Sequence, residues 1–468
     1  MGDLLLALGG PPPAAVPAIA PDFLVERAAG PAALSRFHQL RQRAFVDEQG
    51  LFEGSDLDDR DDDAHTVVLV ARAPDGEVVG GVRLFPELAN RDLAWWRGGR
   101  LVCHPRLGER RGEVGRALVR AACAVAEDLG ALRFDALVQP AREGFFAGLG
   151  WRRVRPVQEA GRPHVLMRWP IARIEELTRR TKGPLGPLLD GLRPGGAGWV
   201  GDDAAPVRGT DVLASVDSIV PSMVERDPVW AGWCGMLVTA GDLSAVGADR
   251  VGALDALAAP TAAHARLVLD GLRAGAEAFG LPILGGHTQL GAPAALSVTG
   301  LGRSTNPIPA GGGQPGDELT LTADLGGAWR PGYTGAQWDS TSEREAAEIH
   351  AMLAAVGRAR PRAAKDVSMA GIAGTLGMLA EASACAAELR VAEVVRPSAA
   401  GLADWLTCFP GFAVLSAADR GAAPLAAGPA QGAPCGRLVP GSGVTLVWPD
   451  GERIEVLPGP ATGMGAAT

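Results

Sequence analysis

Four sites between residues 201 and 288 place carboxylates or glycines beside apolar segments. They are Gly201-Asp202-Asp203-Ala204-Ala205 after Trp199-Val200, Asp217 at the end of an apolar strand, Asp242 within an apolar helix, and Gly285-Gly286-His287-Thr288 after a buried strand. Magnesium prefers hard oxygen ligands and usually links a few carboxylates to substrate phosphates. An aspartate inside an apolar helix is costly without a cation or a hydrogen-bonded partner. Glycines after a strand let backbone N–H groups approach phosphate oxygens. Together, the four sites predict binding of magnesium and phosphates.

The same sites match, in order and approximate spacing, the AIR synthase-related superfamily, which the region 175–460 resembles. Its members include aminoimidazole ribonucleotide synthetase, thiamine-monophosphate kinase, selenophosphate synthetase and a hydrogenase-maturation protein. They use ATP and magnesium to phosphorylate a substrate or to activate an amide-like oxygen. The resemblance implies that the magnesium ligands are Asp202, Asp203, Asp217 and Asp242, of which the first three are also expected to be catalytic. It implies that the nucleotide site is lined by Gly201, Gly285, Gly286, His287 and Thr288.

A further segment, Lys365-Asp366-Val367-Ser368-Met369, resembles the D-[IV]-S-D-G motif of this superfamily. Asp366 and Ser368 match it, and both are expected to bind the cofactor together with Lys365. Met369 replaces the second aspartate, which argues against thiamine-monophosphate kinase itself. The chain has only two lysines, Lys182 and Lys365. Lys365 either reaches a phosphate or is solvated. Lys182 lies upstream of Gly-Asp-Asp without a neighbouring cysteine, which argues against selenium chemistry.

A basic, glycine-bearing turn opens a predicted helix in the first part of the chain, at Arg110 to Ala117. The free N–H groups and the positive dipole end of a helix N-terminus suit a pyrophosphate. The block resembles the GNAT family of N-acetyltransferases, whose coenzyme A loop reads Arg/Gln-x-x-Gly-x-Gly/Ala. Glu113 stands where the inner glycine belongs. The resemblance implies an acetyl-CoA site formed by Arg110, Arg111, Gly112, Gly115 and Arg116.

The general base of such an acyltransferase has several candidates by residue type: Glu48, His65, His104 and Cys103. Each also has a structural interpretation, such as Glu48 pairing with an arginine. The acidic run from Asp56 to Asp63 is predicted to be a solvated loop, because like charges repel and no calcium-loop spacing follows. The segment from Trp329 to Trp338 is either a mobile substrate-binding loop or a packed connection.

Apolar periodicity and turn residues predict alternating helices and strands in three blocks. The two resemblances imply an α/β GNAT domain followed by a two-part α+β unit, with a β-rich, dimerising first part and an α/β sandwich as its second. The expected division is a disordered lead at 1–21, the GNAT domain at 22–170, the first AIR synthase-like part at 171–305, a linker at 306–316, the second part at 317–460 and a tail at 461–468. In the first block, we expect helices at 34–46, 114–129 and 143–149, and strands at 66–71, 78–84 and 132–138.

Composition excludes several classes of protein. The net charge of −9 gives no support to nucleic-acid or membrane-surface binding. No apolar run reaches the roughly 18 residues of a membrane span. The six cysteines are scattered without a CxxC pair, which favours reduced thiols in the cytoplasm.

The resulting hypothesis is a cytoplasmic, homodimeric, bifunctional enzyme that joins an acetyl-CoA-dependent acyltransferase to a Mg-ATP-dependent phosphotransferase or ligase. Its substrate is expected to be a small nitrogen-containing metabolite. The second block is most similar to an AIR synthase-like branch found with bacterial nitrilase gene clusters, whose neighbours include a GNAT protein linked to nitrogen starvation. The alternative is a ligand-binding sensor or scaffold in nitrogen metabolism. Glu113 and Met369 favour that alternative.

Overall fold

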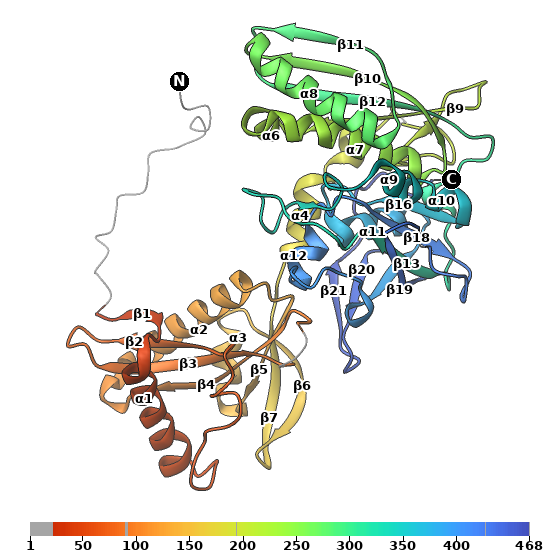
Figure 1. Cartoon of the computed structure of the whole chain (residues 1–468). Coiled ribbons are helices and arrows are strands. Elements are labelled where there is room, and N and C mark those ends of the chain that lie inside the picture. Colours follow the sequence, from red (N-terminus) through yellow and green to blue (C-terminus); the bar gives the residue numbers. More distant parts are fainter. Residues whose placement is uncertain (1–21, 89–91, 193, 426, 468) are drawn as a thin grey trace. The chain divides into compact units, whose positions relative to one another are not determined.

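The computed structural model describes residues 22–88, 92–192, 194–425 and 427–467, and the chain forms two compact units, Met1–Ile171 and Ala172–Thr468 (Figure 1). We call them unit 1 and unit 2. The division lies next to the boundary predicted near Pro170, and the predicted disordered lead falls outside the described residues. Among the helices of the described ranges, none is both long and apolar enough to cross a bilayer.

A seven-stranded sheet with the order β1-β2-β3-β4-β5-β7-β6 forms the centre of unit 1. Its strands are β1 (Leu24–Arg27), β2 (Val67–Arg72), β3 (Val78–Pro86), β4 (Trp95–Cys103), β5 (Arg133–Val138), β6 (Arg152–Glu159) and β7 (Arg162–Trp169). Neighbouring strands are antiparallel except β4 and β5, which are parallel. The predicted strands at 66–71, 78–84 and 132–138 correspond to β2, β3 and β5.

Helices cover both faces of this sheet. They are α1 (Gly30–Arg41), the π-helical η1 (Gln42–Glu48), η2 (Pro105–Arg110), α2 (Arg111–Asp128), η3 (Pro140–Arg142) and α3 (Glu143–Ala147). Adjacent residues of a strand point to opposite faces. A Cβ atom on Gly80 would meet Leu118 of α2 at 3.1 Å, whereas one on Gly81 would meet Phe37 of α1 at 2.5 Å. Therefore α1 and α2 pack on opposite faces. The helix predicted at 34–46 is α-helical only to Arg41 and continues as η1.

The acidic run is a loop, as predicted, with Asp59 and Asp62 exposed, but it is not solvated throughout because three of its aspartates are folded against arginines. Ion pairs join Arg41 of α1, Arg83 of β3 and Arg100 of β4 to Asp56, Asp58 and Asp61. Arg41 is fully buried and donates to Asp56 at 2.8 Å, and Asp56 is 2% exposed. The arginines come from elements distant in sequence, and a local count of charges does not reveal them.

Unit 2 begins with two helices and a five-stranded sheet of order β11-β10-β12-β9-β8. The elements are α4 (Arg173–Thr181), α5 (Leu185–Leu188), β8 (Ala205–Pro206), β9 (Val212–Ile219), α6 (Pro221–Arg226), α7 (Pro228–Ala245), β10 (Asp249–Ala259), α8 (Ala262–Phe279), β11 (Ile283–Leu290) and β12 (Ala295–Arg303). The long helices α7 and α8 lie side by side on one face of the sheet (Figure 1). Thr261 caps the N-terminus of α8, and Gly280 ends it in the left-handed conformation.

Helix α7 is buried on nearly all sides, which explains why its sequence is apolar without a polar stripe. It packs on β9, β12 and α8, and also on β16 of the second sheet. Its contact with α8 depends on glycine. A Cβ atom on Gly232 would lie 2.2 Å from the carbonyl oxygen of Val268, and one on Gly271 would lie 2.0 Å from that of Val229. This packing fixes the position of Asp242 in the third turn from the Gly232 contact.

A seven-stranded sheet of order β16-β18-β13-β19-β17-β20-β21 completes unit 2. Its strands are β13 (Glu318–Ala323), β16 (Ala363–Asp366), β17 (Ala386–Arg390), β18 (Ala413–Ala418), β19 (Gln431–Val439), β20 (Val444–Val447) and β21 (Arg453–Leu457). The remaining elements are η4 (Ala310–Gly312), the hairpin β14 (Ala328–Trp329) and β15 (Trp338–Asp339), α9 (Ala346–Leu353), α10 (Ala355–Ala359), α11 (Gly371–Ala382), η5 (Val391–Glu393) and α12 (Leu402–Thr407). Both units combine helices with a sheet, so the chain is a mixed α/β protein.

The two parts of unit 2 share one hydrophobic core. The core extends from α7 and α8 to Met352 of α9 and Val414 of β18. The segment predicted as a linker at 306–316 is built into it, because Ile308 and Ala310 are buried. The segment from Trp329 to Trp338 is a packed connection: Trp338 is 1% exposed and donates to the carbonyl oxygen of Gly326 at 2.6 Å.

Candidate functional site

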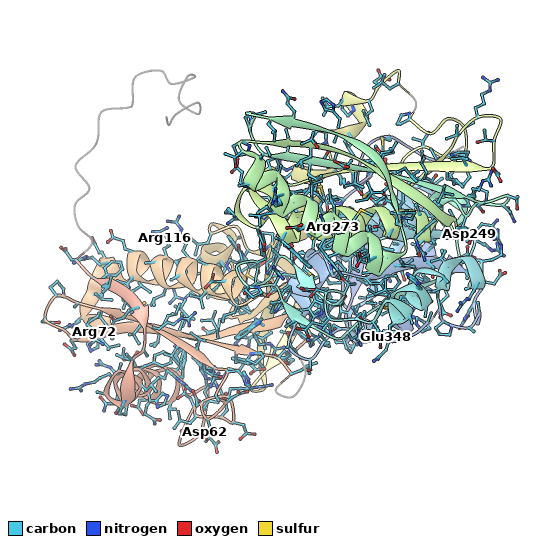
Figure 2. All side chains as sticks on the ribbon, turned by 45° about the horizontal axis from the view of Figure 1, so that its top comes forward. Asp62, Arg72, Arg116, Asp249, Arg273 and Glu348 are labelled. Carbon is cyan, nitrogen blue, oxygen red and sulfur yellow. The ribbon has the colours of Figure 1, made fainter. Side chains whose placement is uncertain are left out.

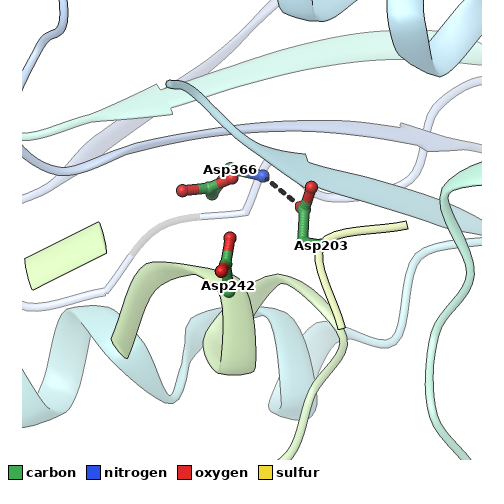
Figure 3. A group of neighbouring side chains, drawn as sticks. All are labelled: Asp203, Asp242 and Asp366. Carbon is green, nitrogen blue, oxygen red and sulfur yellow. Dashed lines mark hydrogen bonds between the residues drawn. The ribbon is translucent and has the colours of Figure 1, made fainter. Parts of the chain in front are cut away.

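Three aspartates from distant parts of unit 2 meet at one point (Figure 3). Asp203 lies in the loop before β8, Asp242 on α7 and Asp366 at the end of β16. One carboxylate oxygen of each lies within 4.8 Å of the others. We call these three residues the carboxylate cluster. Asp242 and Asp366 are only 6% and 7% exposed, whereas charged side chains such as Asp249 and Arg273 lie at the surface of unit 2 (Figure 2).

Lys365 is the nearest cation to the cluster, and its solvated alternative is wrong. Its side chain is 3% exposed and forms an ion pair with Asp203. Its Nζ also donates to the carbonyl oxygen of Gly201 at 3.0 Å. The backbone N–H of Asp366 donates to the other carboxylate oxygen of Asp203 at 2.9 Å. Both oxygens of Asp203 therefore have partners within the chain.

Burial and mutual repulsion oppose ionisation of the cluster. Burial raises the pKa of Asp242 well above its ordinary value, and the charges of Asp217, Asp366 and Asp203 raise it further. Burial and the charges of Asp203 and Asp217 likewise raise the pKa of Asp366. Burial raises the pKa of Asp217, although the neighbouring Asp242 and the charge of Lys182 oppose that shift. A cation held among these groups would relieve the repulsion.

The donor set fits a hard divalent cation. The cluster supplies carboxylate oxygens, which magnesium prefers. Among the described residues, the side chain of Asp366 has neither a hydrogen bond nor an ion pair, although it is 7% exposed. Gly241 precedes Asp242 on α7 and leaves room for this carboxylate, because a Cβ atom there would lie 3.0 Å from Oδ2 of Asp366. Sequence reasoning missed Gly241, although a glycine beside an aspartate in an apolar helix was a usable signal.

The structure brings only two of the four predicted metal ligands into the carboxylate cluster. Asp203 and Asp242 belong to the cluster, whereas Asp217 on β9 is not one of its members, although its charge adds to the effect of burial on the pKa of Asp242. Asp202 lies beside the cluster, where its Oδ1 accepts from the backbone N–H of Ala310 and its Oδ2 is buried without a hydrogen-bond partner among the described residues. Burial raises the pKa of Asp202 to about 7. Asp366, expected only to bind the cofactor, joins the cluster as a third carboxylate.

The glycine-rich segment at 285–288 lies in a different setting from the one predicted. Gly285, Gly286, His287 and Thr288 lie within β11, not after a buried strand. β11 is the edge strand of its sheet and pairs only with β10 in the sheet order. Its side chains are mostly exposed, including Leu284 at 55%. The apolar pair at 283–284 suggested burial because a short apolar run does not distinguish an interior strand from an exposed one.

Two further features complete the surroundings of the cluster. Ser368 is half-buried in the turn before α11, and Met369 is exposed. The charge of Lys182, just after α4, opposes in small part the rise that burial causes in the pKa values of Asp217 and Asp366. Among the described residues, its ammonium group forms no ion pair. Both lysines of the chain therefore act on the same carboxylates.

In unit 1, the predicted coenzyme A segment forms the start of α2. Arg110, Arg111 and Arg116 are exposed, and Arg110 pairs with Asp22 at 3.0 Å. Glu113 is 65% exposed and lies 3.8 Å from Arg110. Gly112 is half-buried, and Gly115 is buried where a Cβ atom would touch Phe145 at 3.4 Å.

For none of the general-base candidates do the contacts with neighbouring residues indicate a catalytic role. Glu48 is exposed and paired with Arg43, and His65 is exposed and paired with Asp63. The ring of His104 accepts from the backbone N–H of Arg106. Burial raises the pKa of Cys103 to about 11. The ion pair with Arg43 agrees with the structural interpretation of Glu48 as an arginine partner.

Comparison with known proteins places unit 2 in a family. Residues 201–304, which contain β8 to β12, match the model of the AIR synthase related protein, N-terminal domain. The chain is also 34% identical over 223 residues to the uncharacterized protein sll0787 of Synechocystis sp., covering 46% of this chain and 69% of that protein. The chain belongs to the AIR synthase-related family.

Two more comparisons concern the AIR synthase-related region. The chain is 29% identical over 99 residues to the thiamine-monophosphate kinase of Methanospirillum hungatei, covering 21% of this chain and 35% of that enzyme. The solved structure of AaThiL complexed with AMPPCP and TMP is 19% identical, has a TM-score of 0.45, and covers 55% of this chain and 89% of that one. These comparisons leave unit 1 without an assigned family.

We predict that Asp242→Asn stabilises the AIR synthase-related unit in the absence of divalent cations. Because Asp242 is ionised in the unfolded chain at neutral pH but has a raised pKa in the folded one, folding must take up a proton there, which an amide does not need. Each unit of pKa shift corresponds to about 1.4 kcal/mol of unfolding free energy. Chemical denaturation in a chelator should show a gain of about 1–2 kcal/mol. The exposed Asp249→Asn serves as the control, with no change expected. A loss of stability in Asp242→Asn would contradict the repulsion argument.

Proposed function

We propose that the AIR synthase-related unit binds ATP with magnesium and uses the γ-phosphoryl group to phosphorylate or activate a small nitrogen-containing metabolite. The observation that carries the proposal is the carboxylate cluster, in which Asp366 is buried without a partner among the described residues. The family match at 201–304 and the relative named a thiamine-monophosphate kinase support phosphoryl chemistry. Nitrogen metabolism follows from the resemblance to the nitrilase-cluster branch.

In this proposal, the residues of the site act by holding charge in place. Asp242, Asp366 and Asp217 hold magnesium, which when bound neutralises charge on the phosphates. Asp203 and Asp202 fix the loop at 201–203 through Lys365 and Ala310. Ser368 lies at the turn beside this site and is available to a phosphate oxygen. Catalysis then comes mainly from positioning and charge neutralisation, as in other phosphoryl transfers.

We predict that Asp217→Asn and Asp366→Asn each lower magnesium-dependent ATP turnover by about a hundredfold or more, because an amide oxygen is a weaker ligand and carries no charge. The measurement is phosphate or ADP release across candidate amines and amides, at several magnesium concentrations. Asp249→Asn should keep full turnover.

Wild-type turnover in both variants would contradict the phosphotransfer proposal. A different outcome concerns the wild-type protein. If calorimetry detects ATP binding but no substrate supports turnover, the sensor hypothesis is favoured instead.

We also propose that unit 2 forms a homodimer through the open face of the five-stranded sheet and its edge strand β11. Exposed apolar side chains gather on these strands: Val216, Leu254, Ile283, Leu284 and Leu290. A paired edge strand would also satisfy its free backbone groups. In such a dimer, Gly285, Gly286 and His287 would face a second copy, and the nucleotide would bind near that interface.

The dimer is tested by Leu254→Asp and Leu284→Asp. A charge on each apolar patch should weaken association by about tenfold or more, because a buried unpaired charge costs several kcal/mol. Analytical ultracentrifugation measures the dissociation constant. Leu188→Asp is the matched control, since Leu188 is 71% exposed on α5 of the same unit. Variants that sediment like the wild type would contradict this interface.

For unit 1, we propose an acyl-coenzyme A site, favoured by one feature of its sheet. The parallel pairing of β4 with β5 covers only Trp95–Gly98 against Arg133–Ala136. Beyond it, β4 continues beside β3 as far as Cys103, and β5 continues beside β7 as far as Val138. The strands thus diverge toward the end of β4 that leads into α2. An acyl-coenzyme A bound there would place its pyrophosphate at the N-terminus of α2.

We predict that Glu113→Gln strengthens coenzyme A binding by about threefold to tenfold, because it removes a negative charge from the first turn of α2. Isothermal calorimetry at low salt measures the affinity. Asp128→Asn at the other end of α2 is the control for net charge and should leave the affinity unchanged. If neither the wild type nor Glu113→Gln binds coenzyme A, the proposal for unit 1 fails.

A further inference from the structure

Lys365 has the surroundings of a bound metal ion more than those of an ordinary ion-paired lysine. Its ammonium group is enclosed, with 3% of the side chain exposed. It donates to two oxygens of one loop, Oδ1 of Asp203 and the carbonyl oxygen of Gly201. The charges of Asp366 and Asp202 also act on it. A carboxylate and a carbonyl oxygen around a compact cation are the ligands that a hard metal ion would select.

Asp203 and Asp366 differ in how far the protein already neutralises them. One oxygen of Asp203 accepts from Lys365, and the other accepts from the backbone N–H of Asp366 at 2.9 Å. The carboxylate of Asp366 has no such partner among the described residues and lies within 4.8 Å of Asp242. A cation from solution would therefore be bound more strongly by Asp366 and Asp242 than by Asp203.

We propose that Lys365 is a built-in cation that replaces a metal ion at Asp203, so that divalent cations are bound by Asp242, Asp366 and Asp217 without Asp203. This inference rests on the proposed magnesium site and refines it. Lys365 is then a positioning residue: it holds the loop at 201–203 in place before any metal binds.

The choice of lysine supports this role. Of 44 lysines and arginines in the chain, only Lys182 and Lys365 are lysines. Arginine presents a broad planar fork that suits bidentate pairs, as in the arginine–aspartate contacts of unit 1. Lysine carries a compact point charge on a flexible stem, which resembles a metal ion more closely. Removing it leaves Asp203 buried without a counterion, a costly state unless another cation enters.

The test counts bound Mn²⁺ by electron paramagnetic resonance in the full chain without nucleotide. We expect Lys365→Met to bind one more ion than the wild type, because Asp203 then needs a counterion. Its thermal unfolding should also become more dependent on the divalent ion than that of the wild type. Lys182→Met is the matched control: it removes the other lysine near the site but no ion pair, and its ion count should equal that of the wild type.

The double variant Lys365→Met/Asp203→Asn removes the pair as a unit and should return the count to the wild-type value. It also serves if Lys365→Met alone does not fold, because the double variant buries no unpaired charge. Fewer ions in the double variant than in the wild type would make Asp203 a metal ligand and overturn the inference. An unchanged count in a folded Lys365→Met would overturn it as well. If the wild type binds no Mn²⁺, the proposed magnesium site itself fails, which is a separate result.

Discussion

The burial of several like charges within a few ångströms is the constraint on which the architecture of unit 2 depends. Burial raises the pKa values of Asp242 and Asp366, and the charges of Asp203 and Asp217 raise both of them further. Such a group does not form unless the surrounding fold holds it. The loop before β8, helix α7 and strand β16 each deliver one carboxylate. The shared core that joins both parts of unit 2 therefore also assembles the site.

Helix α7 shows how packing and electrostatics are coupled. Asp242 lies on a buried helix, and this helix fits against its neighbours because glycines leave room for their close approach. Gly232 and Gly271 let α7 and α8 touch at backbone distance, and Gly241 admits the carboxylate of Asp366. In ordinary helices, glycine costs about 1 kcal/mol relative to alanine. In α7, this cost accompanies the close packing of the helix and the room that Gly241 leaves for a second carboxylate.

Local sequence patterns predicted individual parts of this site but not their mutual arrangement. Asp203, Asp217 and Asp242 stood out because each lies beside an apolar segment. Lys365 was ambiguous, since its partner Asp203 is 162 residues away. The same limit explains the error at 56–63, where buried arginines from α1, β3 and β4 neutralise an apparently repulsive run. Strands such as β2, β3 and β5 were predictable because their apolar runs are local. Edge strand β11 was not, because exposure depends on which strands pair.

The two acidic groups of the chain differ in how far the protein compensates their charges. In unit 1, three aspartates at 56, 58 and 61 face three arginines, so their charges balance within the protein. In unit 2, five aspartates at 202, 203, 217, 242 and 366 face two lysines, and only Lys365 makes an ion pair with them among the described residues. A balanced ionic network has little to gain from another cation and serves to hold a loop. In an unbalanced one, the raised pKa values favour protonated carboxyl groups at a cost to stability, and a cation would relieve that cost. The uncompensated charge, more than the number of carboxylates, therefore identifies the place where unit 2 would bind a metal.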